Sequence, residues 1–108
     1  MADINRLAIQ AKLQSFLPSG KKVYFQPPSS VSLTYPCIIY FRHRGESFHS
    51  VNRPYVYIPI YDVQVIETDP ECPVSQAIGK QLEGSRYDRG WEEESLYHNN
   101  FVVNYYHE

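Results

Sequence analysis

The sequence predicts an α+β fold, with a mainly antiparallel sheet of about four strands and two helices packed on one of its faces. Three observations favour this prediction. The chain has 108 residues, which suits one hydrophobic core and a single domain over residues 1–108. Its 43% hydrophobic and 20% charged residues are typical of a globular chain. Patterned segments follow one another in the order α-β-β-β-α-β, which favours hairpin pairing with helices on one side.

The first two elements are a helix and a short strand. Apolar residues recur with a helical period over residues 3–17, where Asp3 is a candidate N-cap and Pro18 follows the last apolar position. Residues 22–26 then have the composition of a strand. Pro27 and the proline after it cannot continue a ladder, so the strand ends there.

Two longer strands are predicted in the middle of the chain. Residues 37–43 alternate, so that Cys37, Ile39 and Phe41 face away from Ile38, Tyr40 and Arg42. Residues 44–54 are polar and predict either a loop or the tip of a long hairpin. Residues 55–66 give the strongest strand signal, in which Pro59 indicates an edge position or a bulge.

The last third of the chain predicts one helix and one strand. A helix is expected over residues 73–84, with prolines at its start and Gly84 as the stop. Residues 85–99 have no clear period and contain three consecutive glutamates. Residues 100–106 alternate again and close the chain as a strand.

The residues that enzymes and metal sites require are scattered. Without a secretion signal, Cys37 and Cys72 are expected to be reduced thiols, and neither they nor the four histidines have zinc-site spacing. Cys37 and His43 stand about 20 Å apart on one strand, too far to form a nucleophile and base; a pairing with His98 stays open. The five glycines form no phosphate-binding loop. We therefore expect no enzyme, no metal, no cofactor and no catalytic residue.

The charges are unevenly distributed, although the net charge is only −2. Residues 1–61 carry seven basic and two acidic side chains, whereas residues 62–94 carry nine acidic and three basic ones. The two sets either interleave and cancel in the fold or form opposite surfaces. Opposite surfaces would favour head-to-tail association between copies, which can close into a ring.

Ten tyrosines and one cluster of basic and aromatic residues point to an interface. This cluster consists of Phe41-Arg42-His43-Arg44 followed by Arg53. We expect it to contact either an acidic segment of a neighbouring copy or, as an alternative, nucleic acid. The candidate interface residues are Arg42, His43, Arg44, Arg53, Asp88, Arg89, Trp91, Glu92, Glu93 and Glu94.

Membrane insertion and secretion are not expected from the hydropathy pattern. No apolar run approaches the roughly 20 residues of a membrane span. The first residues also lack the basic and apolar regions of a secretory signal.

A succession of short segments resembles a known family. These segments are Tyr35-Pro36-Cys37-Ile38-Ile39-Tyr40, Tyr55, Tyr61-Asp62-Val63-Gln64-Val65-Ile66, Asp69-Pro70, Arg86-Tyr87-Asp88-Arg89, Leu96-Tyr97-His98 and Phe101-Val102-Val103-Asn104-Tyr105-Tyr106. From residue 23 on, the chain is similar to small neck and tail-completion proteins of tailed bacteriophages, of the tail-terminator kind.

This resemblance implies an α+β structural protein of the virion that is assembled in the host cytoplasm. Such proteins form a ring, usually of six copies, which caps the tail tube and offers the surface to which the filled head docks. The implied partners are other copies, the tail tube protein, the head-neck connector protein and genome DNA, which passes through the lumen without sequence-specific binding. A head-closure or connector protein of the adjacent layer is the alternative, followed by a small nucleic-acid-binding module.

Overall fold

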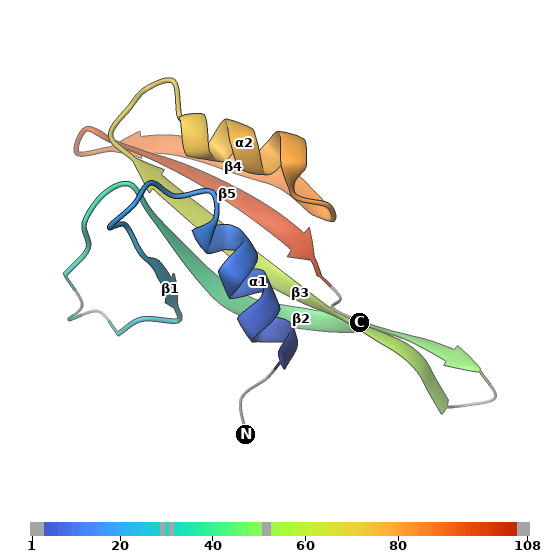
Figure 1. The fold of residues 1–108 in the computed structure, drawn as a ribbon. Coiled ribbons are helices and arrows are strands. Elements are labelled where there is room, and N and C mark those ends of the chain that lie inside the picture. Colours follow the sequence, from blue (N-terminus) through green and yellow to red (C-terminus); the bar gives the residue numbers. More distant parts are fainter. Residues whose placement is uncertain (1–3, 29, 31, 51–52, 106–108) are drawn as a thin grey trace.

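The computed structural model describes residues 4–28, 30, 32–50 and 53–105, with side chains for all of these except 4, 43–50 and 53–58. The elements in chain order are α1 (Ile4–Gln14), β1 (Val23–Phe25), β2 (Cys37–Ser50), β3 (Arg53–Glu67), α2 (Pro73–Gln81), β4 (Ser85–Glu93) and β5 (Leu96–Asn104) (Figure 1). The predicted α+β class is confirmed. The sheet has five strands rather than four, and the chain ends α-β-β rather than α-β.

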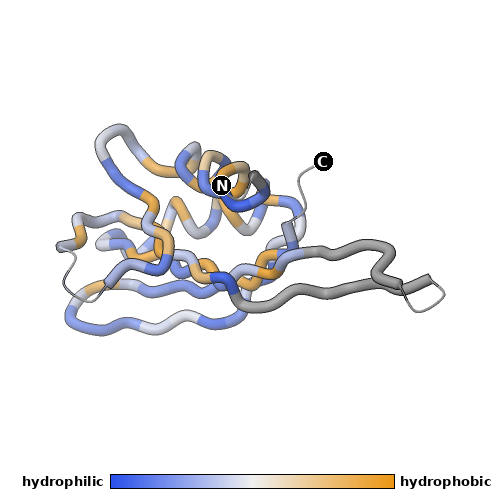
Figure 2. Tube along the Cα trace, turned by 90° about the horizontal axis from the view of Figure 1, so that it is seen from below, coloured by the Kyte–Doolittle hydropathy of each residue, from blue (hydrophilic) through white to orange (hydrophobic). Residues whose placement is uncertain are grey.

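The five strands form one sheet in the spatial order β1-β2-β3-β5-β4. Every neighbouring pair is antiparallel except β1 and β2, which run parallel. Both helices lie on the same face, so the molecule has two layers, with hydrophobic residues gathered between them (Figure 2). The prediction of both helices on one face is confirmed.

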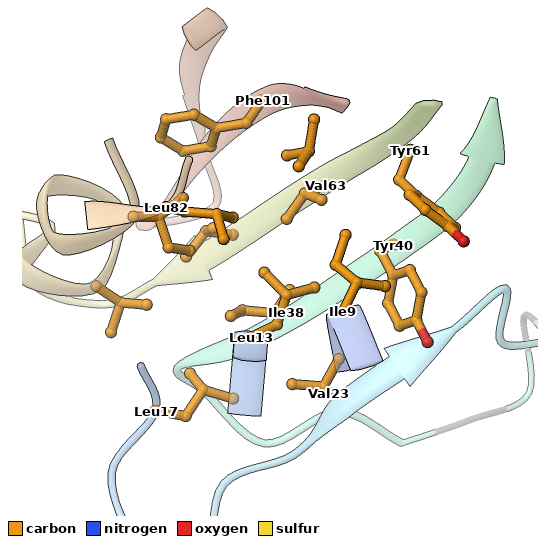
Figure 3. Close-up of a cluster of buried hydrophobic side chains, with 14 residues drawn as sticks. Ile9, Leu13, Leu17, Val23, Ile38, Tyr40, Tyr61, Val63, Leu82 and Phe101 are labelled. Carbon is orange, nitrogen blue, oxygen red and sulfur yellow. The ribbon is translucent and has the colours of Figure 1, made fainter. Parts of the chain in front are cut away.

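The main core lies between the helices and the sheet because both helices and every strand except β4 supply apolar side chains to it (Figure 3). Ile9 and Leu13 of α1 and Ile78 of α2 are fully buried. They pack against the helix-facing side chains of the sheet, which include Tyr40 and Val63. Burial of such a set supplies most of the folding free energy, at about 25 cal/mol per Å² of apolar surface.

Two core tyrosines have their hydroxyl groups bound by polar residues of α1. The Tyr40 hydroxyl donates to Gln10 Oε1 at 2.7 Å and accepts from an Arg6 Nη at 3.3 Å. The amide of Asn5 donates to the Tyr61 hydroxyl at 3.2 Å. Burial raises the pKa of the Tyr40 phenol above its usual value. A polar stripe of α1 therefore satisfies the groups that the tyrosines bring into the core.

The opposite face of the sheet carries a second, smaller cluster. Cys37, Ile39 and Ile66 are buried there, and the partly buried Tyr24, Leu33, Tyr35 and Leu96 pack against them. The alternation predicted for residues 37–43 is confirmed over residues 37–40, because Ile38 and Tyr40 belong to the main core while Cys37 and Ile39 belong to this second cluster.

The hairpin of β2 and β3 extends beyond the rest of the sheet (Figure 1). β3 pairs with β5 only from Ile60 to Glu67, whereas β2 and β3 continue to pair out to Ser50 and Arg53. We call residues 45–50 and 53–59 the arm. Of the two interpretations of residues 44–54, the long hairpin is confirmed and the loop is wrong. A bulge at His43 stands where the arm leaves the sheet, and bulges bend a hairpin in this way.

The sequence did not predict β4, and it placed the start of β5 four residues too late. β4 is an edge strand that is exposed along almost its whole length, so it has no apolar face to alternate with a polar one. A bulge between Tyr87 and Arg89 also shifts its register. The second helix ends at Gln81 rather than 84, and Gly84 takes a positive φ of 82° one residue before β4. The predicted N-cap, Asp3, lies outside the described residues.

Candidate interaction surfaces

The β4–β5 hairpin carries the acidic half of the predicted interface. Glu93 of β4 pairs with Leu96 of β5, and the two residues between them take positive φ angles, 53° at Glu94 and 64° at Ser95. This geometry is that of a type I′ hairpin turn, which usually contains Asn-Gly. The sequence lacks that signal, so the turn was missed. Glu92, Glu93 and Glu94, which we call the acidic tip, are all exposed.

A row of planar side chains crosses the face of the sheet that the helices leave uncovered. The Trp91 ring stacks on the His98 imidazole, with centroids 5.0 Å apart and an interplanar angle of 5°. The Arg89 guanidinium lies 5.1 Å from the Trp91 centroid, within cation–π range. His98 Nδ1 is 3.0 Å from Gln64 Nε2. The predicted interface residues Arg89 and Trp91 thus belong to a wider row that includes His98 and Gln64, which the sequence analysis missed.

The helix-covered side of β4 carries a second exposed aromatic residue. Tyr87 is 56% exposed, packs edge-on against Phe101 at 5.6 Å, and donates its hydroxyl to Asn99 Oδ1 at 3.3 Å. Its ring covers Gly90, because a Cβ built on that glycine would collide with the Tyr87 hydroxyl. Asp88, another predicted interface residue, accepts a hydrogen bond from Asn100 Nδ2 at 3.3 Å.

The basic half of the predicted interface lies at the base of the arm, except for Arg53, which lies within it. Arg42 is exposed just before the arm begins, and its backbone N–H donates to Gln26 Oε1 at 3.1 Å. Arg44 and Arg53 lie on β2 and β3, and their side chains, like that of His43, lie outside the described part of the chain. The arm extends from the Ile60 end of the β3–β5 ladder, whereas the acidic tip follows the other end. The fold therefore separates the two predicted sets rather than bringing them together.

A pocket of about 510 Å³ lies between residues 16–18, which follow α1, the end of β3 and the start of α2. Its most buried polar group is Glu67, which is 1% exposed. Glu67 accepts from the backbone N–H groups of Val74 (3.0 Å) and Ser75 (3.1 Å) and from the Ser75 hydroxyl (2.7 Å). The carboxylate thus caps α2, whose N-cap residue Cys72 makes no side-chain cap. Because all three bonds hold the start of α2, the role of Glu67 is structural.

Cys72 lines a smaller pocket of about 240 Å³. Asn99 Nδ2 donates to Cys72 Sγ at 3.3 Å and to the Ser75 hydroxyl at 3.1 Å. Burial raises the pKa of the Cys72 thiol, against the opposing effect of the Asn99 hydrogen bond. Burial also raises the pKa of the Cys37 thiol to about 11. Both groups are therefore protonated at neutral pH, whereas a cysteine nucleophile acts as the thiolate.

The Cys37–His98 pairing that the sequence left open is not made. Cys37 pairs with Ile66 across β2 and β3, and Ile66 pairs with His98 across β3 and β5. Ile66 therefore stands between them, and two strand spacings amount to about 10 Å.

Among the residues that the structure describes, no three His, Cys, Asp or Glu side chains are grouped so as to hold a metal ion.

In the same described ranges, neither helix has the length and apolar character that a membrane span requires.

No protein-family model matches the sequence, and comparison with curated proteins gives no significant match.

Proposed function

We propose that the chain is a structural subunit of a bacteriophage neck, a tail terminator that assembles into a ring of six copies. The ring caps the tail tube and joins it to the head. Its partners are other copies, the tail tube protein and the head-neck connector protein, and genome DNA passes through its lumen. The subunit catalyses no reaction and functions in the virion after assembly in the host cytoplasm. The family resemblance supports this proposal, and one structural observation carries it.

That observation is the position of two sets of charged residues at opposite ends of the sheet. Arg42, Arg44 and Arg53 stand at the base and the far end of the arm, and the acidic tip lies at the other end of the sheet. The eight β3 residues from Ile60 to Glu67 separate the two ends by about 23 Å. Within one chain, the two sets are therefore too far apart to pair. Between copies, an arm at one end and a complementary tip at the other form a head-to-tail contact, which closes into a ring when the rotation between copies allows it.

The shape of the arm supports association with other chains. Beyond the ladder with β5, six residue pairs of β2 and β3 stand as an isolated two-stranded ribbon. Such a ribbon is marginally stable in water because it buries little surface of its own. It also lengthens the molecule to 52 Å, against 28 and 23 Å in the other directions. A neighbouring subunit would supply the contacts that the ribbon lacks.

Light scattering of charge-reversed variants tests this contact. The arm variant combines Arg44→Glu with Arg53→Glu, and the tip variant combines Glu92→Lys, Glu93→Lys and Glu94→Lys. Each alone should reduce ring formation at least about tenfold, because like charges then meet at every contact. A mixture of the two should restore it, since each variant complements the other. Lys12→Glu with Lys80→Glu, on exposed positions of α1 and α2, is the matched control and should assemble normally.

Three results would argue against the proposal. Wild-type protein that stays monomeric at every concentration, and that also fails to bind assembled tail tubes, would remove the ring and the terminator role. Normal assembly of both charge variants would remove the electrostatic contact. A ring that binds the connector but does not arrest tube growth would favour the head-closure alternative. Wild-type assembly should also weaken with salt, because exposed charge contacts are screened.

A further inference from the structure

The outer edge of β4 is not paired with another strand, and no part of the described chain covers it. β4 is the last strand of the sheet, so β5 is its neighbour on one side and the other side is open. The Asn104 N–H donates to the Gly84 carbonyl at 3.0 Å, which makes that residue pair a hydrogen-bonded one. In an antiparallel ladder such pairs alternate with non-hydrogen-bonded ones. Tyr87, three residues on, therefore directs its N–H and carbonyl away from β5, toward the open edge.

β4 has a bulge and five charged side chains, which are features that protect an edge strand, but it is nine residues long and contains neither proline nor lysine. The other edge of the sheet, β1, has only three residues. Exposed side chains that are frequent in the centres of protein interfaces flank the β4 edge on both faces of the sheet, Tyr87 on one and Arg89 and Trp91 on the other. The edge and its flanks together form an acceptor for a further strand.

The arm offers a strand short enough to lie along the β4 edge, with Arg44 directly before it and Arg53 paired with its last residue. β1 pairs with β2 only as far as Tyr40, so residues 45–50 of β2 have an unpaired outer edge among the described residues. The β3 side of the arm contains Pro54 and Pro59, which lack the N–H group that a ladder requires. The β2 side contains no proline. Its six residues span about 20 Å, and the β4 edge spans about 30 Å.

The occupant of the β4 edge is a second copy of this chain. In the sheet, β3 and β5 stand between β2 and β4. The arm also extends beyond the end of the β3–β5 ladder that lies away from the acidic tip. An arm therefore cannot reach the β4 edge of its own chain. Charge complementarity between copies comes from Arg44 and Arg53, which stand at the two ends of residues 45–50, and from the acidic tip next to the β4 edge.

We propose that residues 45–50 of one copy pair through their backbone with β4 of the next copy, so that one sheet continues from subunit to subunit. This inference rests on the proposed ring. It adds main-chain hydrogen bonds to a contact that charge alone would leave salt-sensitive and weakly oriented.

A proline on the β4 edge tests the main-chain pairing. Tyr87→Pro removes an N–H that points away from β5, and Tyr87→Ala removes the same aromatic side chain but keeps that N–H. The proline variant should self-associate at least about tenfold more weakly than the alanine variant in a light-scattering dilution series. Urea titration of both variants establishes that each remains folded. Hydrogen exchange of wild-type protein should also show slower exchange in residues 45–50 and 85–93 in the ring than in the dilute monomer.

The outcomes separate this inference from the function on which it rests. Rings in which neither segment gains protection, or equal association of the two Tyr87 variants, would overturn the strand pairing and leave the terminator ring intact. Failure of wild-type protein to self-associate, either alone or on tail tubes, would overturn both.

Discussion

Replacement of Glu67 by alanine is expected to lower the free energy of unfolding by about 3 kcal/mol, although Glu67 touches no proposed partner. The side chain is buried and its carboxylate accepts three hydrogen bonds from the start of α2. Pro73, the first helical residue, has no N–H, and Gln76 donates its own to the Cys72 carbonyl at 3.0 Å. The Val74 and Ser75 N–H groups therefore depend on this carboxylate.

The magnitude follows from these bonds and from the pocket beside them. A hydrogen bond to a charged group contributes about 1.5–3 kcal/mol, and loss of an ordinary N-cap costs about 1 kcal/mol. Three full bonds would exceed the expected value. The pocket of about 510 Å³ that Glu67 lines gives water access to the exposed N–H groups, which lowers the cost. Glu67→Gln keeps one acceptor oxygen but places an amide NH₂ where the second oxygen stood, so about 1–2 kcal/mol is expected.

Urea titration followed by far-ultraviolet circular dichroism measures the effect. With a slope of about 1.5 kcal/mol per M, the alanine variant should unfold at a urea concentration about 2 M lower than the wild type. Glu83→Ala removes an exposed glutamate after α2 and should change the unfolding free energy by less than about 0.5 kcal/mol. If Glu67→Ala proved as stable as Glu83→Ala, the reasoning that assigns α2 its cap from β3 would be refuted.

Two further predictions concern stability. Gly84→Ala should cost more than about 2 kcal/mol in urea titration, because a Cβ there combines a positive φ with a collision against the Asn104 carbonyl; Gly20→Ala, which has a similar φ of 86° but open space around it, should cost only about 1 kcal/mol. Equal costs would show that the collision relaxes. Burial raises the pKa of Cys37 from 9.0 to about 11, so the unfolded chain loses this proton first and stability should fall as the pH rises from 9 to 11. Cys37→Ala should remove that part of the decline; an unchanged pH profile would contradict it.

The parts of the fold that the sequence predicted are those with a buried and an exposed side. Ile38 and Tyr40 alternate with Cys37 and Ile39, and both sets pack against separate apolar clusters. The alternation of side chains along β2 therefore predicted correctly which residues face the helices. In β4 alternation gave no such information, because both faces of that strand are exposed and the bulge after Tyr87 shifts the phase. A strand of this kind owes its conformation to pairing with β5, which a local pattern does not record.

The role of Glu67 was recoverable in part from the sequence. Tyr61, Val63 and Val65 all face the helices, and Glu67 continues their period of two. An acidic residue in a core-facing phase needs buried donors, and the nearest helix start lies six residues later. The position of the acidic tip relative to the arm was not recoverable in this way. It depends on the crossover that places β5 between β3 and β4.

The mixing experiment also tests the number of subunits in the ring. In a mixture of arm and tip variants, an arm of one kind is attracted only to a tip of the other kind, so the two variants must alternate around a closed ring. Alternation closes without a mismatch only when the number of copies is even. A six-membered ring should therefore contain three copies of each variant in native mass spectrometry, whatever the mixing ratio. A ring with an odd number of copies leaves one repulsive contact and opens there, and a random distribution of the variants would show that charge does not choose the neighbour.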